Sequence, residues 1–173
     1  MHSQVEIIAG LKNRFEEVVA WFAQRPSTTF CAGPNDRWTE GQHLDHLILS
    51  AKPLNMALRL PRLALRMKFG TAKSGSETLE KLAVRYEKLL AGGGGASGRF
   101  VPPEVKIEDK KCRLDELRKQ GEKLVEVVGA WSESDMDKYV LPHPLLANLS
   151  IRDMLLFTYH HMGHHLMILK RDY

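Results

Sequence analysis

The sequence is poor in cysteine and has no long apolar run, and both shortages narrow the class of protein. Its 173 residues include only two cysteines, Cys31 and Cys112, which form no C-x-x-C pair. This excludes a cysteine-built zinc ribbon and a thioredoxin-type motif, and it favours a reducing compartment. No window approaches the roughly 20 apolar residues of a membrane span. The segment 1–11 lacks the basic start and apolar core of a signal peptide. We therefore expect a cytoplasmic protein with no membrane partner.

Several common catalytic motifs are also missing. The glycine-rich stretch 92–98 is not followed by Lys-Ser or Lys-Thr, so it is not a phosphate-binding P-loop. The sequence contains no G-x-S-x-G elbow and no H-E-x-x-H motif. The net charge of +4 is too small to indicate nucleic acid by itself. A group of basic residues follows the second helix: Arg59, Arg62, Arg66 and Lys68. No aromatic platform for bases accompanies it, so we expect a solvated face and no nucleic-acid partner.

The composition and the apolar spacing are typical of one all-helical domain over residues 1–173. The chain is 43% hydrophobic and 27% charged, as expected of a globular protein. A domain of this length buries roughly 70% of the surface that its unfolded chain exposes, so it needs no disulfide. Four segments have a helical period, and no window alternates like a strand. In the first segment the apolar residues step by three and four positions: Ile8, Leu11, Phe15, Val18 and Phe22.

Turn and capping residues set the expected limits of the first two helices. The first helix should end before a long loop over residues 26–38. Thr39 is expected to cap the second helix, with Gln42 completing a capping box. Pro53 should kink this helix, and Pro61 should mark its end or a second bend.

A shorter helix and two longer ones complete the predicted fold. The shorter helix should lie near residues 76–91 and end at the four glycines 92–95, because glycine has the largest backbone entropy to lose in a helix. A long helix is expected over about 109–131, then an irregular connection over 132–146, and a last helix over about 151–171. This order predicts an all-α four-helix bundle, with a short extra helix and a Gly-rich loop between its second and third long helices.

Histidine is the residue type whose placement stands out, because four of the eight lie together in the last helix. His160, His161, His164 and His165 form two i, i+4 pairs, and each pair can bring two imidazoles to one cation. The pair His161 and His165 shares its face with Ile151, Met154, Leu155, Thr158, Met162, Ile168 and Leu169. The other pair lies nearer the rim and shares its side with Arg152, Asp153, Gly163, Lys170 and Arg171. We therefore expect His161 and His165 to point into the bundle.

Two uncharged imidazoles inside an apolar stripe cost free energy unless each finds a partner. One interpretation is that they are hydrogen-bonded core residues. The other is a metal ion, which needs at least a third ligand, and the second helix offers His43 or His46. Three nitrogens with one open position are typical of a catalytic zinc site. The apolar side of the second helix lies closer in angle to His43 than to His46, so helical-wheel geometry favours His43.

Two segments together resemble a known family. The segment 38–47 (WTEGQHLDHL) joins a tryptophan to a His-Leu pair on the second helix, and the segment 161–165 (HMGHH) places H-x-x-x-H late in the last helix. With the helix order and chain length, these motifs resemble the DinB (DinB/YfiT-like) family over nearly the whole chain. The resemblance implies a four-helix bundle that binds a divalent metal through three histidines, and many members are dimers, so a homodimer is one expected arrangement. Carried over, the ligands are His46, His161 and His165.

The resemblance also implies a function. Characterised relatives include transferases and isomerases that use a low-molecular-weight thiol, so we expect a divalent-metal-dependent enzyme that transfers such a thiol to a small-molecule substrate. A divalent ion with an open position can activate a bound thiol or water. A metal-dependent hydrolase is one alternative, and a non-catalytic metal-binding or interaction module is another. Zinc is the expected ion, with nickel, iron or manganese as alternatives.

Residues near the expected ligands are candidates for contacts to those ligands or to the substrate. They can orient a ligand or move a proton, and the alternative for each is a packing or solvated role. The Gly-rich loop can lie over the site and hold substrate. The candidates are His43, Asp45, Tyr159, His160, His164 and Arg99.

Overall fold

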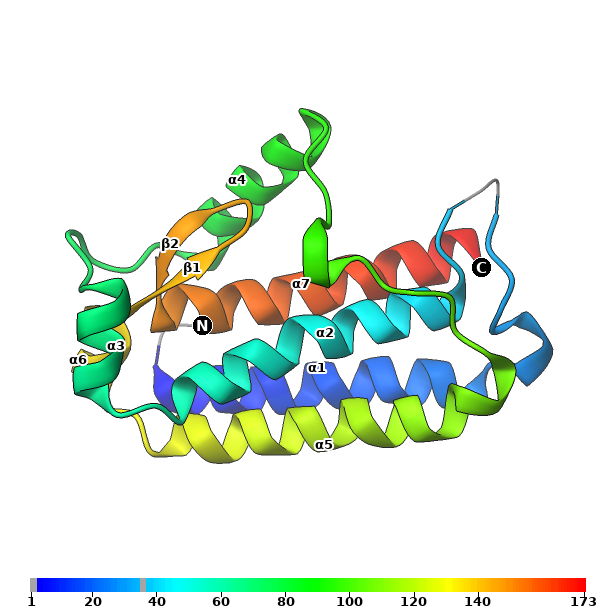
Figure 1. Ribbon diagram of the computed structural model, residues 1–173, viewed down its shortest axis with the longest axis horizontal. Coiled ribbons are helices and arrows are strands. Elements are labelled where there is room, and N and C mark those ends of the chain that lie inside the picture. The colour runs from blue at the N-terminus through cyan, green and yellow to red at the C-terminus, as the bar shows by residue number, and fades with distance from the viewer. Residues whose placement is uncertain (1–2, 35–36) are drawn as a thin grey trace.

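The computed structural model describes residues 3–34 and 37–173, and four long helices dominate it. They run alongside one another as a bundle (Figure 1). Their bounds are α1 Gln4–Gln24, α2 Glu40–Leu58, α5 Lys110–Gly129 and α7 Ile151–Asp172. The predicted all-α four-helix bundle is thereby confirmed. Among the helices of the described residues, none is long and apolar enough to cross a membrane.

The four long helices do not pack equally against one another. α5 packs along both α1 and α2, and α1 packs along α7, whereas α2 and α7 approach each other at few positions. Figure 1 shows α1 and α5 as one layer, with α2 and α7 above it. The space between α2 and α7 is therefore lined by side chains of both helices and by segments outside the bundle. We call this space the α2–α7 seam.

The start of α2 follows the predicted capping box. The Thr39 hydroxyl accepts a hydrogen bond from the backbone N–H of Gln42 at 3.1 Å, and the Gln42 side-chain oxygen accepts one from the backbone N–H of Thr39 at 2.9 Å. The helix continues past Pro53 and ends at Leu58. The loop predicted over 26–38 includes a short 3-10 helix, η1 (Ser27–Thr29), and its residues 35 and 36 lie outside the described part of the chain.

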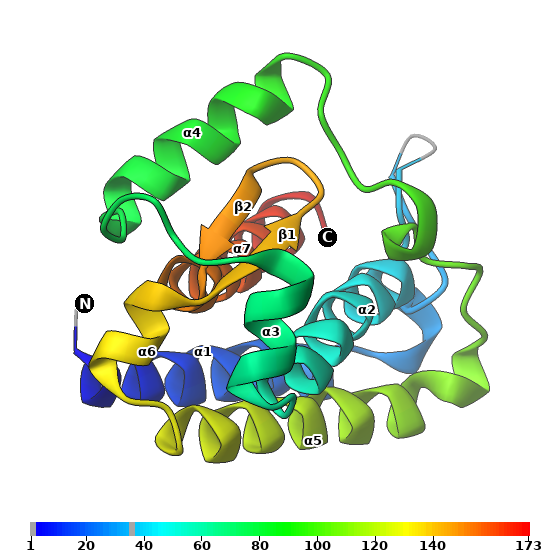
Figure 2. The ribbon, with the colours of Figure 1, turned by 60° about the vertical axis from the view of Figure 1, so that its left-hand side comes forward.

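The short extra helix predicted near residues 76–91 is α4, Leu79–Ala91, capped by the Thr78 side chain. It ends in glycines as predicted. Gly93 has a φ of 89°, and a Cβ on Gly94 would lie 2.7 Å from the carbonyl oxygen of Leu89. The chain then passes through η2 (Gly98–Phe100) and η3 (Ile107–Asp109) to α5. Figure 2 shows this loop crossing from α4 to the neighbourhood of α2, where η2 makes contact.

The structure also contains short elements that the sequence pattern did not predict. The segment 132–146 holds α6 (Glu133–Lys138) and the strand β1 (Val140–His143), which pairs antiparallel with β2 (Ala147–Ser150). The predictions of an irregular connection and of no strand were therefore wrong. The basic group after α2 lies partly on a helix, α3 (Arg62–Phe69), that was also missed. Each strand has four residues and α6 has six, which is too short for a period to appear.

The hairpin covers one side of α7 (Figure 2). Leu141 pairs with Leu149 in its register, and both side chains are buried. Tyr139, just before β1, forms an isolated bridge with Thr71, which ties the hairpin to the segment after α3. The hairpin and η2 therefore form two walls of the α2–α7 seam.

Two charged residues in the first turn of α7 are buried, although the helical period placed them on the rim. The Arg152 guanidinium donates to Asp137 at 2.6 Å and to Glu133 at 2.7 Å. A carboxylate oxygen of Asp153 accepts the backbone N–H of Glu77 at 2.8 Å. Their partners come from other elements, so the period of α7 alone could not reveal them.

The contact between α1 and α5 depends on the absence of a side chain at Gly121. A Cβ at this position would lie 2.7 Å from the ring of Phe15, which is itself buried. Such a distance is too short for real carbon atoms, so the two helices approach as closely as a glycine permits.

Gly121→Ala should lower the free energy of unfolding by about 1–3 kcal/mol, the usual cost of overpacking a core, although alanine is the better helix former. Urea denaturation followed by circular dichroism measures this. Gly129→Ala is the matched control, because a Cβ there meets nothing within 4 Å. Equal stability of Gly121→Ala and wild type would contradict the close approach of α1 and α5.

Candidate metal centre

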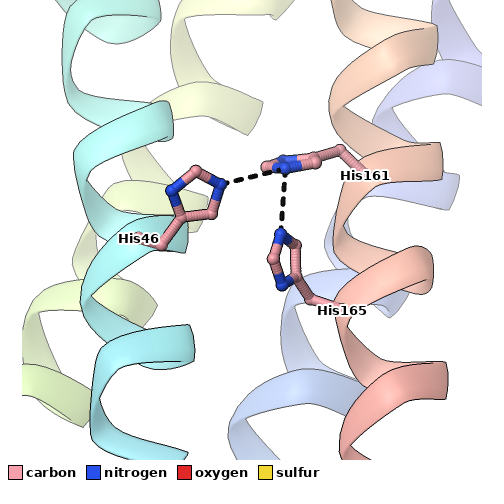
Figure 3. A group of neighbouring side chains, drawn as sticks. All are labelled: His46, His161 and His165. Carbon is pink, nitrogen blue, oxygen red and sulfur yellow. Dashed lines mark hydrogen bonds between the residues drawn. The ribbon is translucent and has the colours of Figure 1, made fainter. Parts of the chain in front are cut away.

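Three buried histidines meet across the α2–α7 seam (Figure 3). His46 comes from α2, and His161 and His165 come from successive turns of α7. The His46 Nε2 lies 3.1 Å from the His161 Nε2, which lies 3.1 Å from the His165 Nε2. One ligand atom from each residue lies within 4.8 Å of the others. The structure thus brings together the three residues that the family resemblance implied as ligands.

A backbone carbonyl fixes the orientation of His46. Its Nδ1 lies 2.7 Å from the carbonyl oxygen of Phe100 in η2. Because a carbonyl only accepts, Nδ1 must carry the proton and donate. In the neutral imidazole, Nε2 then has a free lone pair, and that lone pair faces His161 and His165.

His43 supports the other side of the group. Its Nδ1 lies 2.9 Å from the Nδ1 of His165, so one of these nitrogens donates to the other. The Trp38 ring packs against His43 and His46 with centroids 5.5 and 4.9 Å apart, and it stacks parallel to His165 at 6.2 Å. The helical wheel favoured His43 as the member of the group from α2. In the structure His46 is that member, and His43 lies behind His165.

Burial keeps these imidazoles uncharged at neutral pH. Loss of hydration lowers the pKa of His161 and of His165 well below 6.5, and neighbouring histidines lower both further. The pKa of His43 falls to about 4, chiefly through burial. Burial also lowers the pKa of His46, although the hydrogen bond to Phe100 and the charge of Asp45 oppose it. Neutral imidazole is the form that binds a metal ion.

The arrangement of the three Nε2 atoms leaves one hydrogen bond unmade. A ring nitrogen offers one in-plane N–H or one in-plane lone pair, but the His161 Nε2 faces two nitrogens at 3.1 Å. It can satisfy only one of them well. A cation between the three atoms would accept all three lone pairs at once. Two Zn–N bonds at the tetrahedral angle separate their nitrogens by about 3.3 Å, close to the observed spacing. The residues therefore fit a divalent metal ion, and the cluster can hold one.

A pocket of about 620 Å³ opens beside the group. His46 and His161 form part of its wall, and α2, α7, the hairpin and η2 contribute the rest. This volume lies within the range of small-molecule sites in proteins. A molecule in the pocket would therefore reach two of the three histidines.

Two of the sequence candidates are engaged elsewhere. Asp45 forms a 2.7 Å ion pair with Arg113 of α5. The Tyr159 hydroxyl accepts a hydrogen bond from Arg14 of α1 at 2.9 Å. In the described part of the chain, neither side chain forms a hydrogen bond with the three-histidine group.

The remaining candidates lie around the group. His164 packs edge-on against His165, with centroids 5.4 Å apart, and against Tyr86 of α4. His160 also packs edge-on against Tyr86, at 6.0 Å. Both are half-buried, as the rim placement predicted. Arg99 is exposed at the edge of the pocket, with its guanidinium over the Phe100 ring, so the Gly-rich loop does lie beside the site.

His143 of β1 also lines this pocket, and no sequence pattern predicted it. Its Nδ1 accepts the backbone N–H groups of Leu145 and Leu146 at 3.1 and 3.0 Å. Its ring packs edge-on against Phe157, with centroids 4.3 Å apart. A single histidine between two prolines (Pro-His-Pro) belongs to no helical period, so only its position beside two turn-forming residues set it apart.

The comparison with known families agrees with this geometry. The DinB superfamily matches the chain over residues 11–169, a range that contains His46, His161 and His165. No curated protein gives a significant match to the chain.

The metal-free protein should lose stability in mild acid. All seven histidines of the described residues have a lowered pKa, including His143 at about 4. Below pH 6.5 the histidines of the unfolded chain bind more protons than those of the folded protein. The free energy of unfolding should therefore fall as the pH is lowered from 6.5 towards 4, and it should be constant above pH 6.5 as far as the histidines determine it. Each histidine contributes at most about 1.4 kcal/mol per pH unit.

Urea denaturation between pH 4.5 and 8, in the presence of EDTA, measures this dependence. His143→Asn removes one of the groups while keeping an acceptor for the turn, so its profile should be less steep than that of wild type. A stability that is independent of pH between 4.5 and 6.5 would contradict neutral burial of the imidazoles.

Proposed function

The chain belongs to the DinB superfamily, and we propose that it is a divalent-metal-dependent enzyme with His46, His161 and His165 as ligands. The observation that carries this proposal is the convergence of three uncharged imidazoles beside a pocket whose wall includes His46 and His161. Zinc is the proposed ion because three imidazoles suit it, and nickel, iron and manganese are the alternatives.

The number of available ligands favours a catalytic site over a structural one. Among the described residues, the group has three members from His, Cys, Asp and Glu side chains. Structural zinc sites in proteins are usually closed by a fourth protein ligand, whereas catalytic sites keep that position open. A bound divalent ion would supply Lewis-acid chemistry, which lowers the pKa of a thiol or water at the open position.

The protein's own residues have three tasks in this scheme. The Phe100 carbonyl holds His46 in the tautomer whose Nε2 lone pair is free. His43 and Trp38 hold the His165 ring from behind. The pocket removes an apolar substrate from water and places it against His46 and His161.

The proposed reaction is transfer of a low-molecular-weight thiol to a small electrophile, the chemistry of characterised members that the family resemblance indicates. The thiolate sulfur forms a bond to an electrophilic carbon, the bond from that carbon to its leaving group breaks with both electrons, and the thiol proton passes to a solvent base. The competing proposal is hydrolysis at the same site, in which water takes the place of the thiol.

Metal analysis tests the site itself. Untagged wild-type protein incubated with zinc and desalted should contain about one equivalent of metal by elemental mass spectrometry. His46→Ala, His161→Ala and His165→Ala should each contain almost none, because two imidazoles bind zinc far more weakly than three. His160→Ala is the matched control, since this half-buried imidazole of the same helix is outside the group, and it should keep its metal. Wild type without metal, or loss of metal from His160→Ala alone, would contradict the proposed site.

Turnover separates the two reactions. Metal-loaded protein with a simple thiol and 1-chloro-2,4-dinitrobenzene should consume the thiol and release chloride, and His161→Ala should abolish this rate. Release of nitrophenol from 4-nitrophenyl acetate without any thiol would favour hydrolysis instead. Metal binding with neither activity would support the non-catalytic alternative.

A further inference from the structure

The pocket beside the histidines has a mainly apolar wall and no carboxylate in its lining. Leu54 and Leu47 of α2, Leu141 of β1 and Phe157 of α7 give it an apolar interior. Among the described residues, no Asp or Glu side chain lines the pocket, whereas three cationic side chains do: Lys52, Lys68 and Arg99. A ligand that fills this space should therefore have an apolar body and no positive charge.

Two of the cationic side chains at the pocket have no acidic partner within ion-pair distance in the described part of the chain. Lys68 of α3 and Arg99 of η2 are exposed residues that line the pocket, which places them at its rim. Their charged groups lie over the rings of Phe69 and Phe100, at 5.3 and 5.1 Å from the centroids. The third cation, Lys52, forms a 3.0 Å ion pair with Glu116. The uncompensated charge at the rim is therefore that of Lys68 and Arg99.

His143 adds a hydrogen-bond donor of fixed orientation to the same wall. Two backbone N–H groups donate to its Nδ1, so that nitrogen carries no proton. The neutral ring must then carry its proton on Nε2, which can only donate. No described residue forms a hydrogen bond with the Nε2, and the ring lines the pocket. The donor is thus available to an acceptor atom of a ligand.

From these features we propose that the pocket binds a small molecule with an apolar body and an anionic group, such as a medium-chain carboxylate. The apolar body lies against the α2 and α7 side chains, and the anionic group is attracted by Lys68 and Arg99 and accepts a hydrogen bond from His143. The inference deepens the proposed function, on which it rests for the chemistry that such a molecule meets at His46 and His161. It names the substrate class of that site.

Binding to metal-free protein tests this inference separately from the metal site. We would titrate EDTA-treated wild type with octanoate, octan-1-ol and octylammonium by isothermal titration calorimetry. These probes share one apolar chain and differ in the charge of the head group. Octanoate should bind about tenfold more tightly than octan-1-ol, and octylammonium should bind most weakly, since the rim favours an anion. Equal binding of all three probes, or binding of none, would overturn the proposal.

Matched variants locate the anion. Lys68→Gln and Arg99→Gln should each weaken octanoate binding about threefold and leave octan-1-ol unchanged, because each removes one exposed charge. Arg118→Gln removes an exposed charge from α5 outside the pocket lining and should bind octanoate like wild type. His143→Asn should also weaken octanoate. If both rim variants bound octanoate as tightly as Arg118→Gln, the anion would not lie at this rim and the proposal would be wrong.

The two proposals fail in different ways. Octanoate binding to metal-free protein, together with absence of metal from zinc-treated wild type, would support the ligand class and contradict the proposed function. Metal binding without octanoate selectivity would support the proposed function and contradict the ligand class.

A variant that fills the pocket tests where the ligand lies. Ala57→Trp should abolish binding of every probe, because the side chain of residue 57 lines the pocket. Unchanged binding to this variant, with a wild-type circular dichroism spectrum, would place the ligand elsewhere and overturn the inference.

Discussion

The site depends on burying uncharged imidazoles between α2 and α7, two helices with few direct contacts, and this burial costs free energy. Each ring nitrogen removed from water requires a partner. A continuous series of contacts meets this requirement in part: it runs from the Phe100 carbonyl through His46, His161 and His165 to His43. The series crosses from η2 to α2, on to α7 and back to α2. Polar side chains therefore join α2 and α7 where direct helix packing does not, and three of them, His46, His161 and His165, are the proposed ligands.

Helical periodicity was sufficient to predict the bundle because each long helix buries a continuous apolar stripe. The same reasoning placed His161 and His165 inward, where they are 6% and 5% exposed. For α2 it favoured His43 over His46, although both are buried, at 5% and 6% exposed. What separates them is the direction of the ring relative to α7, and a wheel that treats α2 alone contains no information on its neighbour. The family resemblance supplied that choice.

The features that the sequence did not reveal all depend on contacts between distant segments. The hairpin strands are too short to show alternation, and their pairing is stabilised by burial of Leu141 and Leu149 in a hairpin that packs on α7. The Phe100 carbonyl is a backbone group, so no side-chain motif could mark it. His143 lies at the pocket wall with its ring packed against Phe157 of α7, a contact between two different elements. In each case the local sequence permits the arrangement, and the tertiary fold selects it.

The hydrogen bond between Phe100 and His46 makes the Gly-rich loop part of the binding equilibrium. When the loop is in place, the imidazole is already oriented; when the loop moves away, the ring must find its orientation alone. The ordering of the loop and binding at His46 are therefore two coupled equilibria. The coupling free energy is the same in both directions. Whatever orders the loop raises affinity at His46, and whatever binds at His46 orders the loop. A backbone carbonyl, which substitution of side chains leaves intact, thus links the position of the loop at the pocket to the orientation of His46.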